Sequence, residues 1–411
     1  MSRCNVLFLS DDFPPETNAA ATRVYERAIY WKKWGIDTEI ITNFPNKFLG
    51  KDHVGYSNSL YRVDDVDGIK VVRVKTYVAK KQSTLFRALD QMSYMITSFV
   101  AGIFMRKPDV IISTTPQFFC GLSGMALSKI RGVPFILEVA DIWSDSIKGT
   151  GASSAKFYGA FRAIENYLYR KSNAIIVLTY SFREEILRRG IDDNKLFVIR
   201  NGIKKGLFSG AGKSNNIINK YNLKNRIVVG YIGSLGSAQG LSNVIDAAAI
   251  AHVDNNEDIV FMFVGEGIEK DELVRSSIGL NNVIFIPGQS INVIPDYLSS
   301  CDIGIVHLKD NDVFKKVIPS KILEMMAMGL PILLVSPDGE ATKIVKEYNI
   351  GRWVCSGNPK LLIDTLLEMI ADKDNMKVYS NNSLSAVEHF SREKQAHKVI
   401  DVVNAVTGVK I

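Results

Sequence analysis

The sequence predicts an α/β protein built from two facing, doubly wound domains with parallel sheets. Three observations support this fold class. The chain has 411 residues, and chains of this length usually divide into two domains. Short apolar runs recur along it, as expected for parallel strands that helices cover on both faces. Segments with helical spacing separate these runs, and both halves repeat the same alternation.

The first half contains a series of apolar runs that predict strands, with helical segments between them. In the run 109–113 the apolar residues are consecutive, which is typical of a strand buried on both faces. Strands are expected at 5–9, 37–42, 71–75, 109–113, 135–139, 174–178 and 195–199. Helices are expected at 20–34, 84–105, 120–131, 154–171 and 181–189.

The second half repeats this pattern. Its expected strands are 227–232, 259–264, 283–286, 303–307, 332–335 and 352–354, and its helices include 241–253 and 359–371. The segment between the halves is rich in Gly, Asn and Ser, which favours a linker. The expected divisions are therefore a first domain at 1–203, a linker at 204–224 and a second domain at 225–382. The helical stretch 383–406 could pack on either domain, and we expect the segment 383–411 to cross back to the first.

Charge is distributed unevenly along the chain. The net charge is +7; residues 1–205 carry 30 Lys and Arg against 20 Asp and Glu, whereas residues 206–411 carry 20 against 23. A basic half indicates an anionic partner, which could be a nucleic acid, a lipid surface or a phosphorylated substrate. The alternative is a drift of surface composition without functional meaning.

Composition also bears on compartment and metal binding. The start of the chain lacks the features of a signal peptide, and the longest apolar stretch, Met92–Met105, is too short to span a bilayer. The four cysteines are scattered, which favours a reducing cytosol. Three acid-x-acid triplets lie in loops and are interpreted as compositional, so no metal site is expected.

The run Pro319-Ser320-Lys321-Ile322-Leu323-Glu324 is the most informative segment. Pro and Ser favour a helix start, and the N–H groups and positive dipole end there suit a phosphate. Lys321 adds a full positive charge. Glu324 lies one turn further on and faces the same way, so it could accept hydrogen bonds from sugar or ribose hydroxyls. The alternative is an amphipathic helix with a solvated Lys–Glu pair.

Two glycine-bearing turns follow strands of the second half, at Gly233 to Gly240 and at Gly265 to Gly267. Neither is the G-x-G-x-x-G fingerprint of nicotinamide-cofactor domains. Glycine there still lets the backbone approach a diphosphate closely. Glycines that only make tight turns are the alternative.

Three loops of the first half carry further candidates. Arg200 and Asn201 follow a strand beside the expected linker, where a guanidinium or amide could meet substrate. Asp141, followed by Trp143, stands past the strand 135–139 and could orient a sugar or a nucleophile. The alternatives are a surface turn for the first pair and a helix cap or solvated loop for Asp141. The long first loop, with Pro15, Asn18 and Ala19, leads into a helix that could press against a ligand.

Taken together, these segments resemble the retaining GT-B glycosyltransferases of glycosyltransferase family four (group 1) over nearly the whole chain. The matching segments, in order, are Phe13-Pro14-Pro15, Lys107-Pro108-Asp109-Val110-Ile111, Asp141-Ile142-Trp143, Ile199-Arg200-Asn201-Gly202, Gly233 to Gly240, Phe263-Val264-Gly265-Glu266-Gly267, Cys301-Asp302-Ile303-Gly304, Pro319 to Glu324, Ala327 to Pro331 and Asp338-Gly339-Glu340.

The resemblance implies a GT-B fold of two Rossmann-like domains, an acceptor-binding first domain and a donor-binding second domain. Glu324 matches the second glutamate of the family's Glu-x7-Glu motif, which holds the ribose, whereas the first falls at Lys316. Ser234 and Gln239 stand where the family usually has arginine and lysine, so Lys321 is expected to neutralise the diphosphate. Alanines at 19–21 replace the usual twin glycines. This pattern resembles a branch that works on bacterial surface polysaccharides, often with amino-deoxy sugars.

The expected function is transfer of a hexosyl-type sugar, with retention and without metal or cofactor, from a nucleotide-sugar donor, UDP-linked, to a glycan or polyprenyl-diphosphate-linked acceptor in O-antigen or capsule synthesis. Lys321 and Asp141 are the expected catalytic residues, and Trp143 joins the first loop on the acceptor side. The expected donor site is Arg200, Asn201, Gly233, Ser234, Gln239, Gly265, Lys316, Pro319, Ser320, Lys321 and Glu324.

The basic first domain suggests a cytoplasmic enzyme at the inner face of the plasma membrane. Lys32-Lys33-Trp34, Lys80-Lys81 and the helix 92–105 are candidates for the membrane-facing surface. Two alternatives to this function are a nucleotide-sugar epimerase of the same architecture and a nucleic-acid-binding protein. The second is suggested only by an isoelectric point near 9.0, and no arginine-rich helix or aromatic stacking series accompanies it, so no nucleic-acid partner is expected.

Overall fold

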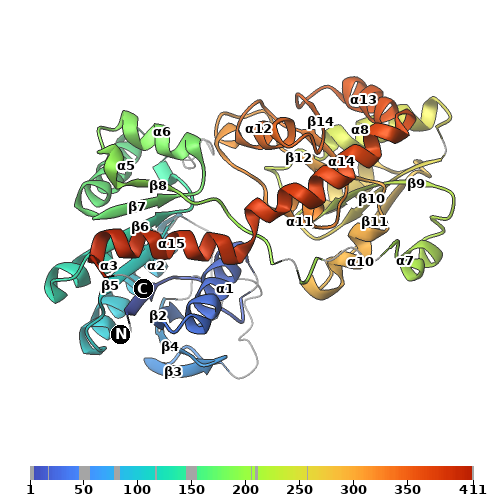
Figure 1. Cartoon of the computed structure of the whole chain (residues 1–411). Helices are drawn as coiled ribbons and strands as arrows, with labels where there is room; N and C mark the ends of the chain where they lie inside the picture. Colours follow the sequence, from blue (N-terminus) through green and yellow to red (C-terminus); the bar gives the residue numbers. More distant parts are fainter. Residues whose placement is uncertain are drawn as a thin grey trace. The chain divides into compact units, whose positions relative to one another are not determined.

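The computed structural model describes residues 4–16, 18–45, 56–77, 84–115, 118–144, 155–204, 206–208, 212–256 and 258–409. The chain forms two compact units (Figure 1). Unit 1 comprises Met1–Gly202 together with Arg392–Ile411, and unit 2 comprises Ile203–Ser391. Each unit is a twisted sheet with helices on both faces, so the prediction of a two-domain α/β fold with parallel sheets is confirmed.

Unit 1 contains an eight-stranded sheet in the order β3-β4-β2-β1-β5-β6-β7-β8. Every neighbouring pair is parallel except β3 and β4. The central strands are buried throughout, in agreement with their continuous apolar runs. The strands are β1 (Asn5–Leu9), β2 (Asp37–Asn43), β3 (Tyr61–Val66), β4 (Ile69–Val74), β5 (Val110–Thr114), β6 (Phe135–Val139), β7 (Ala174–Val177) and β8 (Leu196–Val198).

Helices connect these strands and cover the sheet of unit 1. The helices are α1 (Ala19–Lys33), α2 (Thr84–Phe104), α3 (Phe118–Arg131), α5 (Ala155–Lys171), α6 (Tyr180–Arg188), the short 3-10 helix η1 (Asp193–Lys195) and α15 (Arg392–Thr407). No helix in the described part of the chain combines the length and the hydropathy needed to cross a bilayer.

The edge strand β3 was not predicted from the sequence. It forms an antiparallel hairpin with β4 through Asp67 and Gly68, both of which have positive φ. Most of its side chains are exposed, so the strand has no apolar run. The Asp-Gly pair, a common two-residue hairpin turn, was the available signal.

The end of the chain departs from the single helix expected at 383–406. Instead, α14 (Lys373–Ala386) and the 3-10 helix η4 (Val387–Phe390) belong to unit 2, and α15 begins at Arg392 after an extended Ser391. α15 packs on α1, where the Trp31 indole N–H donates to the Ala396 carbonyl at 3.1 Å. Apolar side chains of α15, among them Val399 and Val403, are part of the core of unit 1.

Unit 2 contains a six-stranded, wholly parallel sheet in the order β11-β10-β9-β12-β13-β14. Alternate side chains of β9 enter separate apolar clusters: Val228 and Ile232 enter one, Val229 and Tyr231 the other. The strands are β9 (Ile227–Ile232), β10 (Ile259–Val264), β11 (Val283–Ile286), β12 (Ile303–His307), β13 (Ile332–Val335) and β14 (Gly351–Val354).

The segment 204–224, expected to be a linker, is counted with unit 2 in the structure. Phe208, Ile217 and Leu223 are buried in its core, which the Gly, Asn and Ser content of the segment concealed. The helices of unit 2 are α7 (Asn215–Lys220), α8 (Ser242–Val253), α9 (Lys270–Ser276), α10 (Ile294–Ser299), α11 (Ser320–Ala327), α12 (Glu340–Glu347), α13 (Pro359–Ala371) and α14, with the 3-10 helices η2 (Ile291–Val293), η3 (Phe314–Lys316) and η4.

Candidate functional site

Two glycine turns lie against each other at the carboxyl ends of β9 and β10 in unit 2. The Gly233 amide donates to the Val264 carbonyl at 2.8 Å, and the Leu235 amide donates to the Glu266 carbonyl at 2.9 Å. A Cβ on Gly265 would lie 1.9 Å from the Gly233 oxygen. Gly265 is therefore needed because two backbone segments meet there. In parallel sheets, ligands bind at this carboxyl edge.

Lys321, near the start of α11, extends over the turn at Gly233. A Cβ on Gly233 would lie 2.3 Å from the Lys321 Cε atom and 2.6 Å from its Nζ atom. Residues of α11 pack in one apolar cluster of unit 2, whereas Tyr231 packs in the other. The missing side chain at Gly233 thus gives Lys321 room to cross the backbone and reach Tyr231.

The Lys321 ammonium donates to the Tyr231 hydroxyl at 2.8 Å and lies 4.6 Å from the centre of its ring. Burial lowers the pKa of Lys321 to about 8, while Glu324 acts in the opposite direction. Within the described residues, Tyr231 is the one hydrogen-bond partner found for this ammonium, which can donate three hydrogen bonds. The site therefore holds a partly buried cation with unused donors.

The start of α11 adds backbone donors to this cation. Pro319 occupies the N-cap position and Ser320 is the first helical residue, and no side chain caps this end of the helix. The first N–H groups of a helix lack partners within it, and they carry the positive end of the helix dipole. The expected grouping of Pro319, Ser320 and Lys321 is thus present in unit 2, with Gly233 beside it.

Glu324 lies in the same helix, one turn beyond its start, and is partly buried. Burial raises its pKa, and Lys321 opposes this shift. Among the described residues, no ion pair joins Glu324 to Lys321. Burial thus disfavours the charged form of both side chains. A ligand could stabilise Lys321 with an anionic group and Glu324 with hydrogen-bond donors.

Polar contacts from neighbouring residues hold the rest of the Gly233–Gly240 turn in place. The Gln239 side-chain oxygen accepts from the Gly236 amide at 3.2 Å, so it closes its own turn. The His307 Nδ1 atom lies 2.5 Å from the Gln239 carbonyl, and its Nε2 atom lies 2.8 Å from the Asn243 side-chain oxygen. Burial lowers the pKa of His307 to about 4, so a neutral ring holds this turn at neutral pH. Ser234 is exposed on the same turn.

Lys316 lies in η3, four residues before the start of α11. The Lys315 carbonyl in this 3-10 helix is so close to Gly339 that a Cβ there would lie 2.1 Å from it. Lys315 pairs with Asp312 at 2.7 Å.

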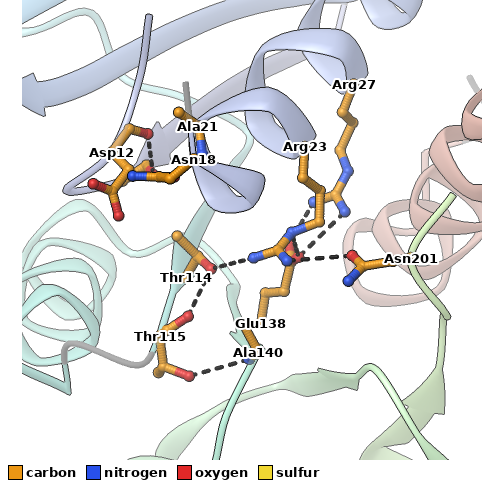
Figure 2. A network of polar contacts seen from close by, with 11 residues as sticks. Asp12, Asn18, Ala21, Arg23, Arg27, Thr114, Thr115, Glu138, Ala140 and Asn201 are labelled. Atoms are coloured by element: carbon orange, nitrogen blue, oxygen red, sulfur yellow. Dashed lines mark hydrogen bonds and ion pairs between the residues drawn. The ribbon is translucent and has the colours of Figure 1, made fainter. Parts of the chain in front are cut away.

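Arg200 and Asn201, which were predicted to bind the donor, lie in unit 1 rather than among the unit 2 residues. Asn201 accepts a hydrogen bond of 3.3 Å from Arg23, a residue of α1 (Figure 2). Arg200 lies over the Tyr180 ring, 5.4 Å from its centre. Both residues follow β8 at the carboxyl edge of the unit 1 sheet.

Arg23 belongs to a buried charge network that sequence reasoning missed. Its Nε atom lies 2.7 Å from Glu138, which also pairs with Arg27. Figure 2 shows Arg23 reaching from this carboxylate to Thr114, at the end of β5, and to Asn201, which follows β8. Burial would raise the pKa of Glu138, but the two guanidinium groups hold it at about 2. The signal in the sequence was Arg23 and Arg27, one turn apart on a helix face that must be buried.

Asp141 and the first loop lie at the same carboxyl edge of unit 1. The backbone oxygen of Asp141 accepts from the Thr115 hydroxyl at 3.5 Å, and Trp143 packs edge-on against Phe161 at 4.9 Å between ring centres. Asn18 caps α1 by accepting from the Ala21 amide at 2.9 Å, and Ala19 is exposed beside it.

The proline pair of the first loop is also tied to unit 1. Pro15 is partly buried, and the preceding Pro14 carbonyl accepts a hydrogen bond of 2.5 Å from Arg73.

The candidates for a membrane-facing surface have different positions. Lys32 donates to the Asp67 carbonyl at 2.7 Å, and the Trp34 ring packs at a tilt against His397 of α15, with 4.7 Å between ring centres. These residues are therefore engaged within unit 1. Lys80 and Lys81 lie outside the described residues. The predicted helix 92–105 corresponds to the second part of α2.

Two family models match the chain, one in each unit. The model described as "Glycosyl transferase 4-like domain" matches residues 18–202, and the model described as "Glycosyl transferases group 1" matches residues 213–386. Together they span most of both units. The matches favour neither the epimerase nor the nucleic-acid-binding alternative.

Relatives and solved structures agree with the family models. A protein of Escherichia coli (strain K12), WcaI, whose name assigns it as a glycosyl transferase to colanic acid biosynthesis, is 27% identical over 79% of this chain and 81% of its own length. WbjE of Pseudomonas aeruginosa, named as a glycosyltransferase, is 24% identical over 66% of this chain and 68% of its own. The structure of HepE from Anabaena in complex with UDP has a TM-score of 0.73 and 17% identity, covering 98% of this chain and all of that one.

Proposed function

The chain belongs to the group 1 glycosyltransferases, and we propose that it transfers a sugar from a UDP-sugar to a hydroxyl group of a glycan or a polyprenyl-diphosphate-linked glycan. The transfer retains the anomeric configuration and uses no metal. The single observation that carries the donor assignment is the Lys321 ammonium, which lies over Gly233 at the uncapped start of α11.

UDP is the nucleotide best supported by the comparisons. HepE, whose fold this chain shares, has been crystallised with UDP, with UDP and glucose, and with UDP-glucose. In this chain, the matching region would present the Gly233 and Gly265 turns to the diphosphate, and Glu324 would accept hydrogen bonds from the ribose hydroxyls.

The chemistry requires stabilisation of the negative charge that builds on the leaving diphosphate. Lys321 and the N–H groups at the start of α11 would supply it without reorganisation, because the fold already holds them in place. A charge-assisted hydrogen bond of this kind contributes about 1.5–3 kcal/mol. Asp141, in unit 1, is proposed to orient the acceptor or the transferred sugar.

The test of the donor site compares Lys321→Met with Lys377→Met, which removes an exposed lysine of α14 in the same unit. UDP binding is measured by calorimetry and turnover with a UDP-sugar panel. We expect Lys321→Met to lower kcat by about 10²–10³-fold and to weaken UDP binding, while Lys377→Met changes neither. Equal UDP affinity in wild type and Lys321→Met would contradict the donor site.

A role in bacterial surface-polysaccharide synthesis, such as O-antigen or capsule, is supported by the relatives. WcaI is named for colanic acid biosynthesis and TuaH of Bacillus subtilis for teichuronic acid biosynthesis, and both names refer to bacterial surface polymers. The proposed donor sugar is a hexose or an amino-deoxy hexose. Incorporation of a radiolabelled sugar into lipid-extractable material, with membranes as acceptor, would test the acceptor class.

The proposed place of action is the inner face of the plasma membrane, and α2 offers the surface that fits it. Large apolar side chains recur there with helical spacing and are exposed: Leu89, Met92, Ile96, Val100, Ile103 and Phe104, the last at 84%. Exposed basic residues lie beyond the end of the helix (Arg106, Lys107) and at the end of α3 (Lys129), which packs on α2. Apolar side chains beside basic ones fit a bilayer that contains anionic lipid.

Vesicle flotation tests this surface. We expect the protein to float with vesicles that contain phosphatidylglycerol and less with pure phosphatidylcholine. Ile96→Ser with Phe104→Ser should reduce flotation, and Leu60→Ser, which removes an exposed apolar residue elsewhere in unit 1, should not. Unchanged flotation of the double variant would contradict the membrane assignment. So would a dimeric wild-type protein that becomes monomeric in the double variant without any change in flotation.

A further inference from the structure

Tyr231 is a buried phenol directly beneath the proposed donor site, and no sequence pattern drew attention to it. Its side chain is 1% exposed, and its ring packs near Phe263 within the unit 2 core. Its hydroxyl makes two hydrogen bonds, at 2.8 Å with Lys321 Nζ and at 2.6 Å with the Ser234 carbonyl.

The direction of both hydrogen bonds follows from the chemistry of the groups. An ammonium can only donate and a carbonyl can only accept, whereas a phenol has one proton and also accepts. Lys321 must therefore donate to the Tyr231 oxygen, and the single phenolic proton must go to the Ser234 carbonyl. The hydroxyl thereby joins the cation to the glycine turn.

The ring and the hydroxyl of Tyr231 act separately on Lys321. The ring lies 4.6 Å from the ammonium and would attract it without a hydrogen bond. Only the hydroxyl fixes the direction in which the ammonium points and ties it to Ser234. Replacing Tyr231 by Phe removes the second effect and keeps the first.

We propose that Tyr231 is a positioning residue for sugar transfer, whose hydroxyl holds Lys321 and the Ser234 turn so that both face one diphosphate. The inference rests on the proposed function, because it takes the diphosphate of a UDP-sugar as the anion. Tyr231 itself does not touch the substrate; it acts through Lys321 and the turn.

The test is Tyr231→Phe, with Tyr297→Phe as the matched control. Tyr297 is another buried tyrosine of unit 2, in α10, so the control removes a comparable hydroxyl away from the site. We expect Tyr231→Phe to lower kcat about tenfold or more, with a smaller change in KM, because charge on the leaving group is greatest in the transition state. Thermal unfolding of each variant shows whether it is folded.

The pH profile separates positioning from general support of the fold. The hydrogen bond to Tyr231 favours the charged amine, so its loss should move the upper limb of the kcat/KM profile to lower pH. Tyr297→Phe should leave the profile where it is. A Tyr231→Phe profile identical to that of wild type would overturn the proposal.

A double-mutant cycle with Lys321→Met completes the test. If Tyr231 acts through Lys321, adding Tyr231→Phe to Lys321→Met should cause no further loss of kcat. A further loss as large as in wild type would overturn the inference. If Lys321→Met alone leaves UDP binding unchanged, the donor site fails instead, so the two failures are distinguishable.

Discussion

Burial acts against the charge of Lys321, and the fold offsets this effect only in part. The side chain crosses the backbone at Gly233 and donates to one neutral hydroxyl. Its pKa of about 8 reflects this environment. A lysine held in this way is suited to bind an anion, because among the described residues no carboxylate forms an ion pair with it and a bound anion would do so.

Between about pH 8 and 10, we expect the free energy of unfolding of the unliganded protein and its affinity for UDP to change in opposite directions. The folded-state pKa of Lys321 lies below its ordinary value of 10.5, so in this window the unfolded chain holds a proton that the folded protein has released. The free energy of unfolding should therefore rise with pH. UDP affinity should fall, because the amine loses its charge.

The free energy of unfolding and the UDP affinity are each compared between wild type and Lys321→Met, because the difference cancels the titration of other groups. Urea unfolding gives the stability, and calorimetry gives the UDP affinity at each pH. Parallel pH dependence of wild type and variant in both quantities would show that Lys321 titrates outside this range.

At the scale of the element, the donor side of unit 2 depends on backbone segments that approach without side chains. The turns after β9 and β10 share hydrogen bonds and meet at Gly233 and Gly265. Any side chain at Gly265 would separate the turns and shift Gly233, over which Lys321 passes. Glycine is thus required there by close approach.

Gly265→Ala should lower both stability and donor binding. The added Cβ would lie 1.9 Å from the Gly233 oxygen, and overpacking of this kind costs about 1–3 kcal/mol. UDP affinity should fall with it, because the turn beneath Lys321 must move. Gly212→Ala is the control, since nothing lies within 4 Å of the added carbon there. Equal behaviour of the two variants in unfolding and calorimetry would refute the argument.

The sequence predicted those elements whose burial requires a recognisable spacing of apolar residues. Most of the parallel strands are buried runs, and each was placed within about two residues of its bounds. The strand β3 lacked this pattern because it is exposed. The break before α15 was missed because both flanking segments are helical; Ser391, with Glu393 in the first turn, marks the new helix start.

The candidate site was predictable where its proposed functional residues are adjacent in one segment of the sequence. Pro319 to Glu324 are consecutive, so their grouping was visible in the sequence. Tyr231 and Arg23 were missed because their partners are distant in the chain: Lys321 in one case, Glu138 and Asn201 in the other. Such pairings depend on how the sheet is assembled, and no local spacing encodes them.

At the scale of the whole molecule, unit 2 is continuous in sequence and unit 1 is not. The core of unit 1 includes Ala396, Val399 and Ile400 from α15, which pack with Trp31 and Val24 of α1. The chain leaves and rejoins unit 2 at neighbouring positions, since the Ile203 amide donates to the Phe390 carbonyl at 2.8 Å.

We expect a fragment of residues 203–391 to fold alone and a fragment of residues 1–202 to fail. The second lacks α15 and would expose the apolar surface around Trp31. Joining residues 392–411 to residue 202 through a short Gly/Ser linker should restore folding, because Ile203 and Ser391 are paired. Thermal unfolding followed by circular dichroism would decide, and cooperative unfolding of the 1–202 fragment would contradict the role of α15.

The late position of α15 also orders events during synthesis. Residues 1–202 leave the ribosome before α15, so their core lacks its covering helix until residues 392–407 have been translated. Residues 203–391 complete their own core before that happens. The nascent amino-terminal half therefore exposes apolar surface around Trp31 while nearly two hundred further residues are added. In that interval it is the part of the chain most in need of a chaperone.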